Sequence, residues 1–411
     1  MDFISEYHEM AWNSALKVLS PTQAQLEHGL ELHRDLFCMD HFGFLPTSCW
    51  NHNIVTKWDE FKARNIGQRA LSKRIEYMMY DECCQDPEHA DQFRKAMRAS
   101  GLKCMVQTVA EGKSREEDFR RMSCNIEVLR TFSDVIAQAG SPDEIARVNA
   151  EGKIAVVWSV NGPPLAGELQ DPEQELETVL DWYRVGVRLM HLSYNRRNHI
   201  ADGCTEEADG GISALGIELI KRMNKLGIIV DVPHTGRQSS LDAARYSEKP
   251  MMASHTAARS LFDFARCKDD ETLRAIADTD GMVGVYAYSS MLGGSGDLAM
   301  LLNHIDHIVK TVGVDHVGIG TDLQYQRKWA DEVYQMKTYD NPEYSSRWWG
   351  NWQQAPHTAP KKGEDIYGSL AWINWPLYTV GLVTRGYTDD QIARIQGKNF
   401  LRVLAANQPE R

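Results

Sequence analysis

Short apolar runs recur eight times along this chain, and helical stretches separate them. Several of the runs are apolar on both faces, as expected of strands that lie between a core and a layer of helices. The stretches between them carry apolar residues at helical spacing, as in 173–183, 216–225, 270–278 and 298–311. The eight runs are Leu36–His41, Cys104–Val109, Ile154–Val160, Val187–Leu192, Ile228–Val232, Met251–His255, Met282–Tyr286 and His316–Thr321.

This alternation of strand and helix predicts an α/β fold, a (β/α)8 TIM barrel closed by a parallel sheet. An open doubly wound sheet is the alternative, but no GxGxxG motif or phosphate-binding loop follows a strand. Because α/β barrels of this length commonly form one unit, we expect a single domain over residues 1–411.

Two segments interrupt the alternation, at about 44–103 and 323–367. Both leave the C-terminal face of the predicted barrel, where barrel enzymes build their active sites. The first contains a helical pattern around 59–80, and the second is rich in Trp, Tyr, Pro and Gly. The second segment fits either a pocket wall or lid, or a packed surface excursion or oligomer contact. A capped helix pair over 387–405 is expected to end the fold.

Charge and composition narrow the range of partners. The net charge of −12 argues against nucleic acid and anionic membranes, because both require a basic face. No stretch reaches the roughly 18 uninterrupted apolar residues of a membrane span, and the N-terminus does not have the pattern of a signal peptide. The eight cysteines include no CxxC pair. Reduced thiols and a cytoplasmic location are therefore expected, with a small molecule as the partner.

Three polar side chains end predicted strands. His234 follows the run 228–232, His255 ends the run 251–255, and Asp322 follows the run 316–321. The C-terminal strand ends of a barrel converge on one site, so these side chains are expected to lie close together. Two imidazoles and a carboxylate suit a divalent ion such as zinc. A lone histidine at a strand end is more often structural, and the set of three is what favours a site.

Several motifs in order give the chain a family resemblance over about Leu36–Leu404. They are MHLSYNRRNHIADGC, GGISALGIELIKRMNKLGIIVDVPHTG, ASHTAARSL, DHVGIGTD and GKNFLRVL. Together they resemble the membrane (renal-type) dipeptidases of peptidase family M19, which are zinc-dependent enzymes with an amidohydrolase-like barrel. The resemblance implies a barrel of the metallo-dependent hydrolase type, and it also suggests a homodimer.

Carried over residue by residue, the resemblance assigns five roles. His234 and His255 match the histidines that bind one zinc. Asp322 matches the aspartate that binds the other zinc and handles protons. Arg266 falls where an arginine grips the substrate carboxylate, although a surface ion pair is the other interpretation. Tyr194 stands where a residue contacts the substrate.

Three ligand positions of the family are replaced. Alignment on the following Leu-Pro puts Phe42 at the position of a histidine and Phe44 at that of an aspartate. Asn161 replaces the metal-bridging glutamate. Regular strand alternation would point Asp40 inward with Phe42 and His41 outward, and a bulge is the one way to turn His41 back toward the site.

With these changes, the resemblance implies one zinc ion, bound by His234, His255 and Asp322. Binding of no zinc ion, or of two, remains an alternative. Phe42 and Phe44 would line the vacated ion pocket, where they suit a ring or alkyl group or simply fill the volume. Together with Asn161, they are assigned to substrate binding.

The function expected from the sequence is a divergent, metal-dependent dipeptidase-like hydrolase. Its substrate would be a small carboxylate-bearing amide or dipeptide-like molecule, with Asp322 as general base and acid and Arg266 as anchor. One alternative is a lyase, isomerase or decarboxylase on the same barrel with one metal ion or none. Another is a non-catalytic binding protein.

Overall fold

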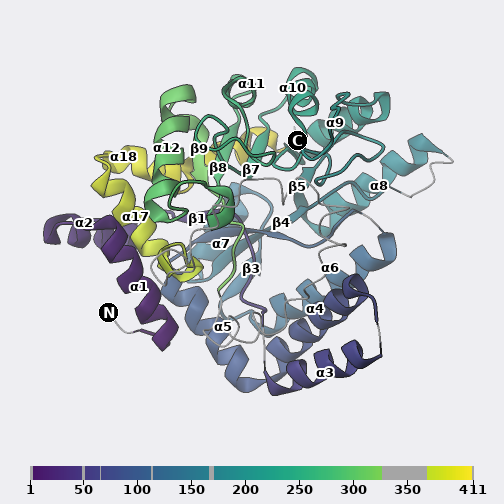
Figure 1. Cartoon of the computed structure of the whole chain (residues 1–411). Coiled ribbons are helices and arrows are strands. Elements are labelled where there is room, and N and C mark those ends of the chain that lie inside the picture. Colours follow the sequence, from purple (N-terminus) through teal and green to yellow (C-terminus); the bar gives the residue numbers. More distant parts are fainter. Residues whose placement is uncertain are drawn as a thin grey trace.

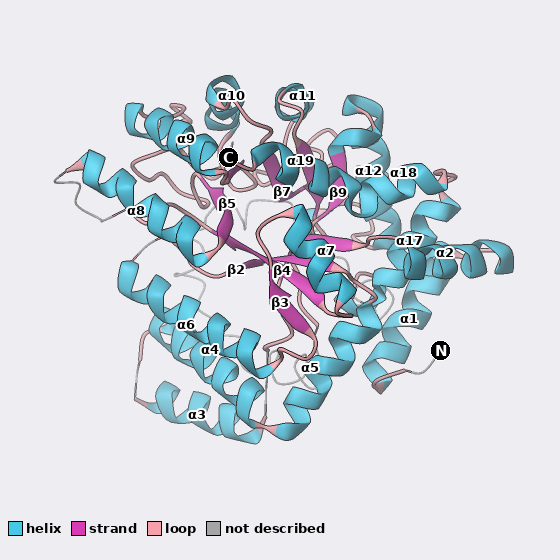
Figure 2. Ribbon diagram, turned by 180° about the vertical axis from the view of Figure 1, so that it is seen from behind, coloured by secondary structure: helices cyan, strands magenta, loops and turns pink. Residues whose placement is uncertain are grey.

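The computed structural model describes residues 3–48, 51–64, 66–112, 114–165, 171–325 and 368–409. Within these residues a parallel sheet runs in the order β1-β2-β4-β5-β6-β7-β8-β9, and helices surround it (Figures 1 and 2). The strands of this path are β1 (Met39–Gly43), β2 (Cys104–Thr108), β4 (Ile154–Val160), β5 (Val187–His191), β6 (Ile229–Asp231), β7 (Met252–Thr256), β8 (Met282–Val285) and β9 (Val317–Ile319).

The barrel closes where β1 meets the chain just after β9. The Asp322 amide donates to the Phe42 carbonyl oxygen at 2.8 Å, and the Phe44 amide donates to the Leu323 carbonyl oxygen at 2.9 Å. A parallel bridge between Phe44 and Gln324 continues this pairing. The eight predicted strands are therefore confirmed within a few residues, and so is the predicted TIM barrel.

One strand was not predicted. β3 (Ile136–Gln138) pairs with the first half of β4, while β5 pairs with its second half. Because β3 has only three residues, its sequence carries too little period-two pattern to be recognised.

The strands are apolar on both faces because one apolar layer lies inside the barrel and another lies between the strands and the helices. Met39, Val106, Val157, Leu189 and Met252 pack together inside the barrel. They are joined there by apolar residues of α19 (Asn399–Asn407), the closing helix of the fold. The alternate residues of the strands pack against the surrounding helices. This double burial is the arrangement that parallel barrels require.

The helices other than α19 lie outside the sheet, and the four helical stretches that the sequence analysis delimits are among them. α11 (Asp270–Asp278) has the predicted bounds, and three others agree within three residues at each end: α8 (Pro172–Val185), α9 (Ala214–Leu226) and α12 (Leu298–Val312). The remaining α-helices in the described residues are α1 (Glu6–Leu19), α2 (Gln23–Asp35), α3 (His52–Ala63), α4 (Gln68–Gln85), α5 (Pro87–Ser100), α6 (Arg115–Thr131), α7 (Pro142–Ala150), α10 (Arg237–Tyr246), α17 (Trp375–Thr384) and α18 (Asp389–Ala393).

The first insertion contains α3, α4 and α5, where the sequence indicated one helical stretch around 59–80. Residues 326–367 of the second insertion lie outside the described residues, and the single-domain division stays a prediction. In the described part of the chain, no helix is long and apolar enough to cross a membrane. The seven cysteines described there form no disulfide with one another.

Strand β1 does not alternate regularly, because its register with β2 shifts between Asp40 and Gly43. The expectation that Asp40 would point inward is therefore wrong. Its carboxylate accepts hydrogen bonds from the Thr321 amide at 2.9 Å, from the Thr321 hydroxyl at 2.6 Å and from Trp372 Nε1 at 3.0 Å. His41, expected outward, instead packs against Phe400 of α19 inside the barrel. A bulge breaks the period of two and produces both changes.

The Asp40–Trp372 hydrogen bond gives a pH-dependent prediction. Burial raises the pKa of Asp40 to about 7, while the hydrogen bonds from Thr321 and Trp372 lower it. Since this pKa lies above that of an exposed aspartate, the stability that Asp40 contributes falls as the pH rises from about 4 through 7. Trp372→Phe removes a donor to the ionised form and should make this fall steeper. We expect its cost in unfolding free energy to be about 1 kcal/mol at pH 5 and about 2 kcal/mol at pH 8.

Chemical denaturation at both pH values tests this prediction. Trp375→Phe is the matched control, because Trp375 is also buried and its Nε1 has no hydrogen-bond partner among the described residues. Its cost should not depend on pH. A Trp372→Phe cost that stays equal at the two pH values would contradict the prediction.

Candidate active site

The structure brings His234 and His255 together at the C-terminal ends of neighbouring strands. His234 follows β6 and His255 lies on β7, and both side chains are buried. Their Nε2 atoms are 3.0 Å apart. We call these two residues the histidine pair.

The Nδ1 atom of each histidine lies within hydrogen-bond distance of a polar side chain. His234 Nδ1 lies 2.5 Å from Asn195 Oδ1, and His255 Nδ1 lies 2.9 Å from Ser254 Oγ. An amide oxygen can only accept, so His234 carries its proton on Nδ1. Burial lowers the pKa of both histidines well below the usual value, and the charge of Arg266 lowers it further. Both imidazoles are therefore neutral.

Aromatic rings cover the histidine pair. The ring of Phe42 stacks on His255 at a centroid distance of 3.9 Å, and the ring of Tyr194 stacks on His234 at 4.0 Å. Phe44 contacts Phe42 edge to face at 5.8 Å. The two phenylalanines thus form an apolar wall beside the imidazoles, and their role in substrate binding stays a proposal.

Arg266 lies deep inside the site, with an exposed fraction of 1%. It donates to the Pro233 carbonyl oxygen through Nη1. Through Nη2 it contacts His234 Nε2 and the His255 carbonyl oxygen, both at 3.2 Å. The interpretation of Arg266 as part of a surface ion pair is therefore wrong. Its Nε is buried without a hydrogen-bond partner among the described residues.

Lys268 is a second buried cation near the histidine pair. It donates to the Thr235 carbonyl oxygen, and its Nζ lies 3.0 Å from Ser240 Oγ. Burial lowers the pKa of Lys268 to about 8. Its charge also contributes to the lowered pKa of both histidines.

The carboxyl group of Asp322 lies at the end of β9. Asp322 has a left-handed backbone with φ of 58°, which is uncommon for a residue other than glycine. Burial raises the pKa of Asp322 to about 7, although the positive charge of Arg266 lowers it. Burial also raises the pKa of Tyr194, and the charges of Glu111 and Asp322 raise it further. Two carboxylates and the phenol therefore share one electrostatic environment.

Glu111 was not predicted from the sequence. It follows β2 and accepts a hydrogen bond from Asn161 Nδ2 at 3.2 Å. Asn161 in turn accepts from the Thr108 hydroxyl at 3.1 Å. Arg121 forms ion pairs with Glu111 and, at 3.2 Å, with Glu76. The acidic residue in the run Val109–Gly112, at a strand end, was the available signal. The role of Asn161 in binding substrate stays a proposal.

A buried pair formed by His191 and Asp231 was likewise not predicted from the sequence. His191 Nε2 lies 3.1 Å from Asp231 Oδ2, and both side chains are fully buried. The ring of His191 lies 5.7 Å from that of His234 and 5.6 Å from that of His255. Asp231 Oδ1 accepts a hydrogen bond from the Ser254 amide at 2.8 Å. Polar residues at the ends of β5 and β6 were the signal for this pair.

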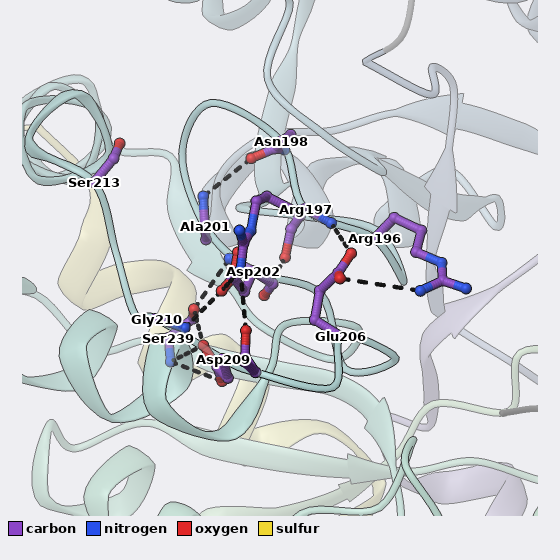
Figure 3. Close-up of polar contacts among 12 residues, drawn as sticks. Arg196, Arg197, Asn198, Ala201, Asp202, Glu206, Asp209, Gly210, Ser213 and Ser239 are labelled. Atoms are coloured by element: carbon purple, nitrogen blue, oxygen red, sulfur yellow. Dashed lines mark hydrogen bonds and ion pairs between the residues drawn. The ribbon is translucent and has the colours of Figure 1, made fainter. Parts of the chain in front are cut away.

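The loop after β5 includes Tyr194 and Asn195, which contact His234. Ion pairs link other residues of this loop (Figure 3). Arg197 pairs with Asp202, with Nη2 and Oδ2 2.8 Å apart, and Asp202 also accepts from the Gly210 amide at 2.6 Å. Glu206 accepts from the Arg197 amide at 2.8 Å and lies 4.0 Å from Arg196. Both arginines therefore have acidic partners in the loop.

A cavity of about 210 Å³ opens beside Phe44. Phe44, Gln107, Arg121 and Gln324 line it, together with Tyr80 of α4. Because Phe44 also contacts Phe42, this cavity lies next to the apolar wall of the site.

The model of the membrane dipeptidase family (peptidase family M19) matches residues 75–341, which are 267 of the 411 residues. The chain belongs to this family. The resemblance seen in the motifs is thereby confirmed.

Three similar proteins illustrate this membership. An uncharacterized dipeptidase of Schizosaccharomyces pombe is 32% identical over 212 residues, which are 50% of this chain and 48% of that protein. Dipeptidase tcpJ of Claviceps purpurea is 24% identical over 296 residues, covering 71% and 60% of the two chains. The structure of the probable dipeptidase PvdM from Pseudomonas aeruginosa has a TM-score of 0.64 and 20% identity, covering 94% and 99%. The chain thus spans about half to three fifths of the two curated relatives.

Membership of a metallopeptidase family implies metal dependence, and the donors of this site can be compared with that requirement. A zinc site needs at least three protein ligands. In the described residues, no three His, Cys, Asp or Glu side chains are placed to hold an ion. The structure brings His234 and His255 together without a third such donor, so the residues do not fit the predicted ion.

The stacking of Phe42 on His255 leads to a stability prediction. Phe42→Ala should lower the unfolding free energy by about 3–5 kcal/mol, because it removes a fully buried ring and leaves a cavity. Phe44→Ala is the matched control and should cost less than half as much, since Phe44 is only half-buried. Chemical denaturation of the two variants gives both values. Equal costs would show that Phe42 does not have this packing role.

Proposed function

We propose that this chain is a divergent dipeptidase-like hydrolase. Its substrate is a small amide or dipeptide-like molecule that carries a carboxylate. Membership of the family supports hydrolysis, and the dipeptidase names of the two curated relatives support the substrate class. The observation that carries the proposal is the position of Asp322, a half-buried residue just after β9 whose carboxyl group interacts electrostatically with Arg266 and Tyr194.

In this proposal, Asp322 acts as the general base. A pKa raised to about 7 suits a group that takes a proton and returns it near neutral pH. Asp322 accepts a proton from water, whose oxygen bonds to the amide carbon. The carbon–nitrogen bond then breaks, and the same proton passes from Asp322 to the leaving nitrogen.

Three other residues bind and orient the substrate in this scheme. The unpartnered Nε–H of Arg266 donates to an oxygen of the substrate, either on its carboxylate or on the reacting carbonyl. Phe42 and Phe44 exclude water and contact an apolar side chain of the substrate. A small molecule is thus the proposed partner, and a homodimer and a cytoplasmic location stay predictions from the sequence.

A non-hydrolytic reaction on the same barrel is the second candidate. The observation in its favour is the donor set, because the two histidines converge without a third metal ligand among the described residues. A lyase, isomerase or decarboxylase would use Asp322 and Tyr194 as proton-transfer groups on a small carboxylate. Its product would have the mass of the substrate or a smaller mass, whereas hydrolysis adds one water.

Asp322→Asn tests the proposal directly. Asparagine tolerates the left-handed backbone and keeps the shape of the side chain, but it does not accept a proton at neutral pH. We expect kcat to fall by about 10²–10⁴ with little change in KM. The assay is mass spectrometry of products from dipeptides and N-acyl amino acids, preceded by a screen with the wild-type protein.

Asp315→Asn is the control for this experiment. Asp315 lies at the opposite end of β9, in the turn Val314–His316, and pairs with Arg394 at 2.5 Å. This variant should retain full turnover. If Asp322→Asn is as active as wild type, or if the wild-type protein converts substrates without adding water, the hydrolase proposal fails.

A further inference from the structure

We propose that the Arg266 guanidinium is the resident cation of the histidine pair and takes the place of a metal ion there. This inference concerns what the pair binds, and it holds whichever reaction the site performs. It rests on the hydrogen bonds around the two rings and on the burial of Arg266.

The proton positions around the histidine pair are complete without an ion. His234 carries its proton on Nδ1, because its partner there is the Asn195 amide oxygen. Its Nε2 is therefore a bare acceptor with one lone pair. The two groups that reach this atom are His255 Nε2, at 3.0 Å, and Arg266 Nη2, at 3.2 Å.

His255 supplies one of the two protons directed at that lone pair. With its proton on Nε2, His255 has a bare Nδ1, which accepts from the Ser254 hydroxyl at 2.9 Å. The chain of donors thus runs from Ser254 through His255 to His234 and ends at Asn195. Arg266 adds a second donor at His234 Nε2, and no nitrogen of the pair lacks a partner.

A metal ion would compete for the lone pair that Arg266 already contacts. Zinc binds a histidine nitrogen at about 2.0–2.1 Å, which places the ion on the same side of the ring as the guanidinium. Arg266 is 1% exposed and is anchored to the Pro233 and His255 carbonyl oxygens. The ion would have to displace a buried cation that has fixed partners.

The surrounding charges also disfavour a divalent ion. Lys268 is buried nearby, so two cationic side chains lie close to the histidine pair. Arg121 offsets the charge of Glu111 by an ion pair, and Asp231 Oδ2 lies 3.1 Å from His191 Nε2.

Metal-binding measurements test this inference independently of turnover. Purified wild-type protein is analysed for zinc and then titrated with Co²⁺, whose visible absorption reports tetrahedral coordination. We expect neither bound zinc nor a cobalt spectrum. Arg266→His and Arg266→Asp each remove the guanidinium and supply the third protein ligand that the histidine pair lacks. At least one of these variants should gain one ion per chain.

Two controls link the gained ion to the histidine pair. A second substitution, His234→Ala, in the variant that gains the ion should abolish its binding. Arg259→Met changes an exposed arginine that pairs with Asp263 at 2.7 Å, and it should behave as wild type.

Two outcomes would overturn the inference. One is a wild-type protein that holds a zinc ion which His234→Ala removes, and this result does not depend on whether the Arg266 variants fold. The other is a set of folded Arg266 variants that gain no ion, because the guanidinium would then not be what keeps an ion from the pair.

Discussion

The backbone junction between β1 and β9 is the interaction on which the site depends. Closing a parallel barrel requires the last strand to hydrogen-bond to the first, and here two residues of the site perform that task. The amide of Asp322 donates to the carbonyl of Phe42, so the same bond closes the sheet and fixes the positions of both side chains. The fold itself therefore sets the positions of the proposed general base and of the apolar wall.

The two sides of this site differ in the charges that surround them. On the side of β6 and β7, neutral imidazoles lie between aromatic rings and buried cations. On the side of β2 and β9, the carboxylates Glu111 and Asp322 raise the pKa of Tyr194. In the proposed reaction, a substrate in contact with both sides places an anionic or carbonyl oxygen near Arg266, and Asp322 transfers the proton from the side of β9.

The sequence predicted the barrel well, because doubly buried parallel strands give continuous apolar runs that are easily separated from amphipathic helices. It also located the strand ends that carry His234, His255 and Asp322. The direction of Asp40 was predicted wrongly, since a bulge in β1 depends on tertiary contacts with Thr321 and Trp372. Glu111 and the buried His191–Asp231 pair were missed for a related reason. A single polar residue in an apolar run does not reveal its partner, which lies on another strand.

The left-handed backbone of Asp322 has an evolutionary consequence. Among residues with a side chain, asparagine and aspartate adopt this conformation most readily, so few substitutions at this position keep the barrel junction unstrained. The chain can lose the proposed acid–base group through a single nucleotide change to asparagine and still fold. If Asp322 has that role, descendants that have abandoned catalysis are expected to show asparagine or glycine at this position while the rest of the barrel sequence is retained.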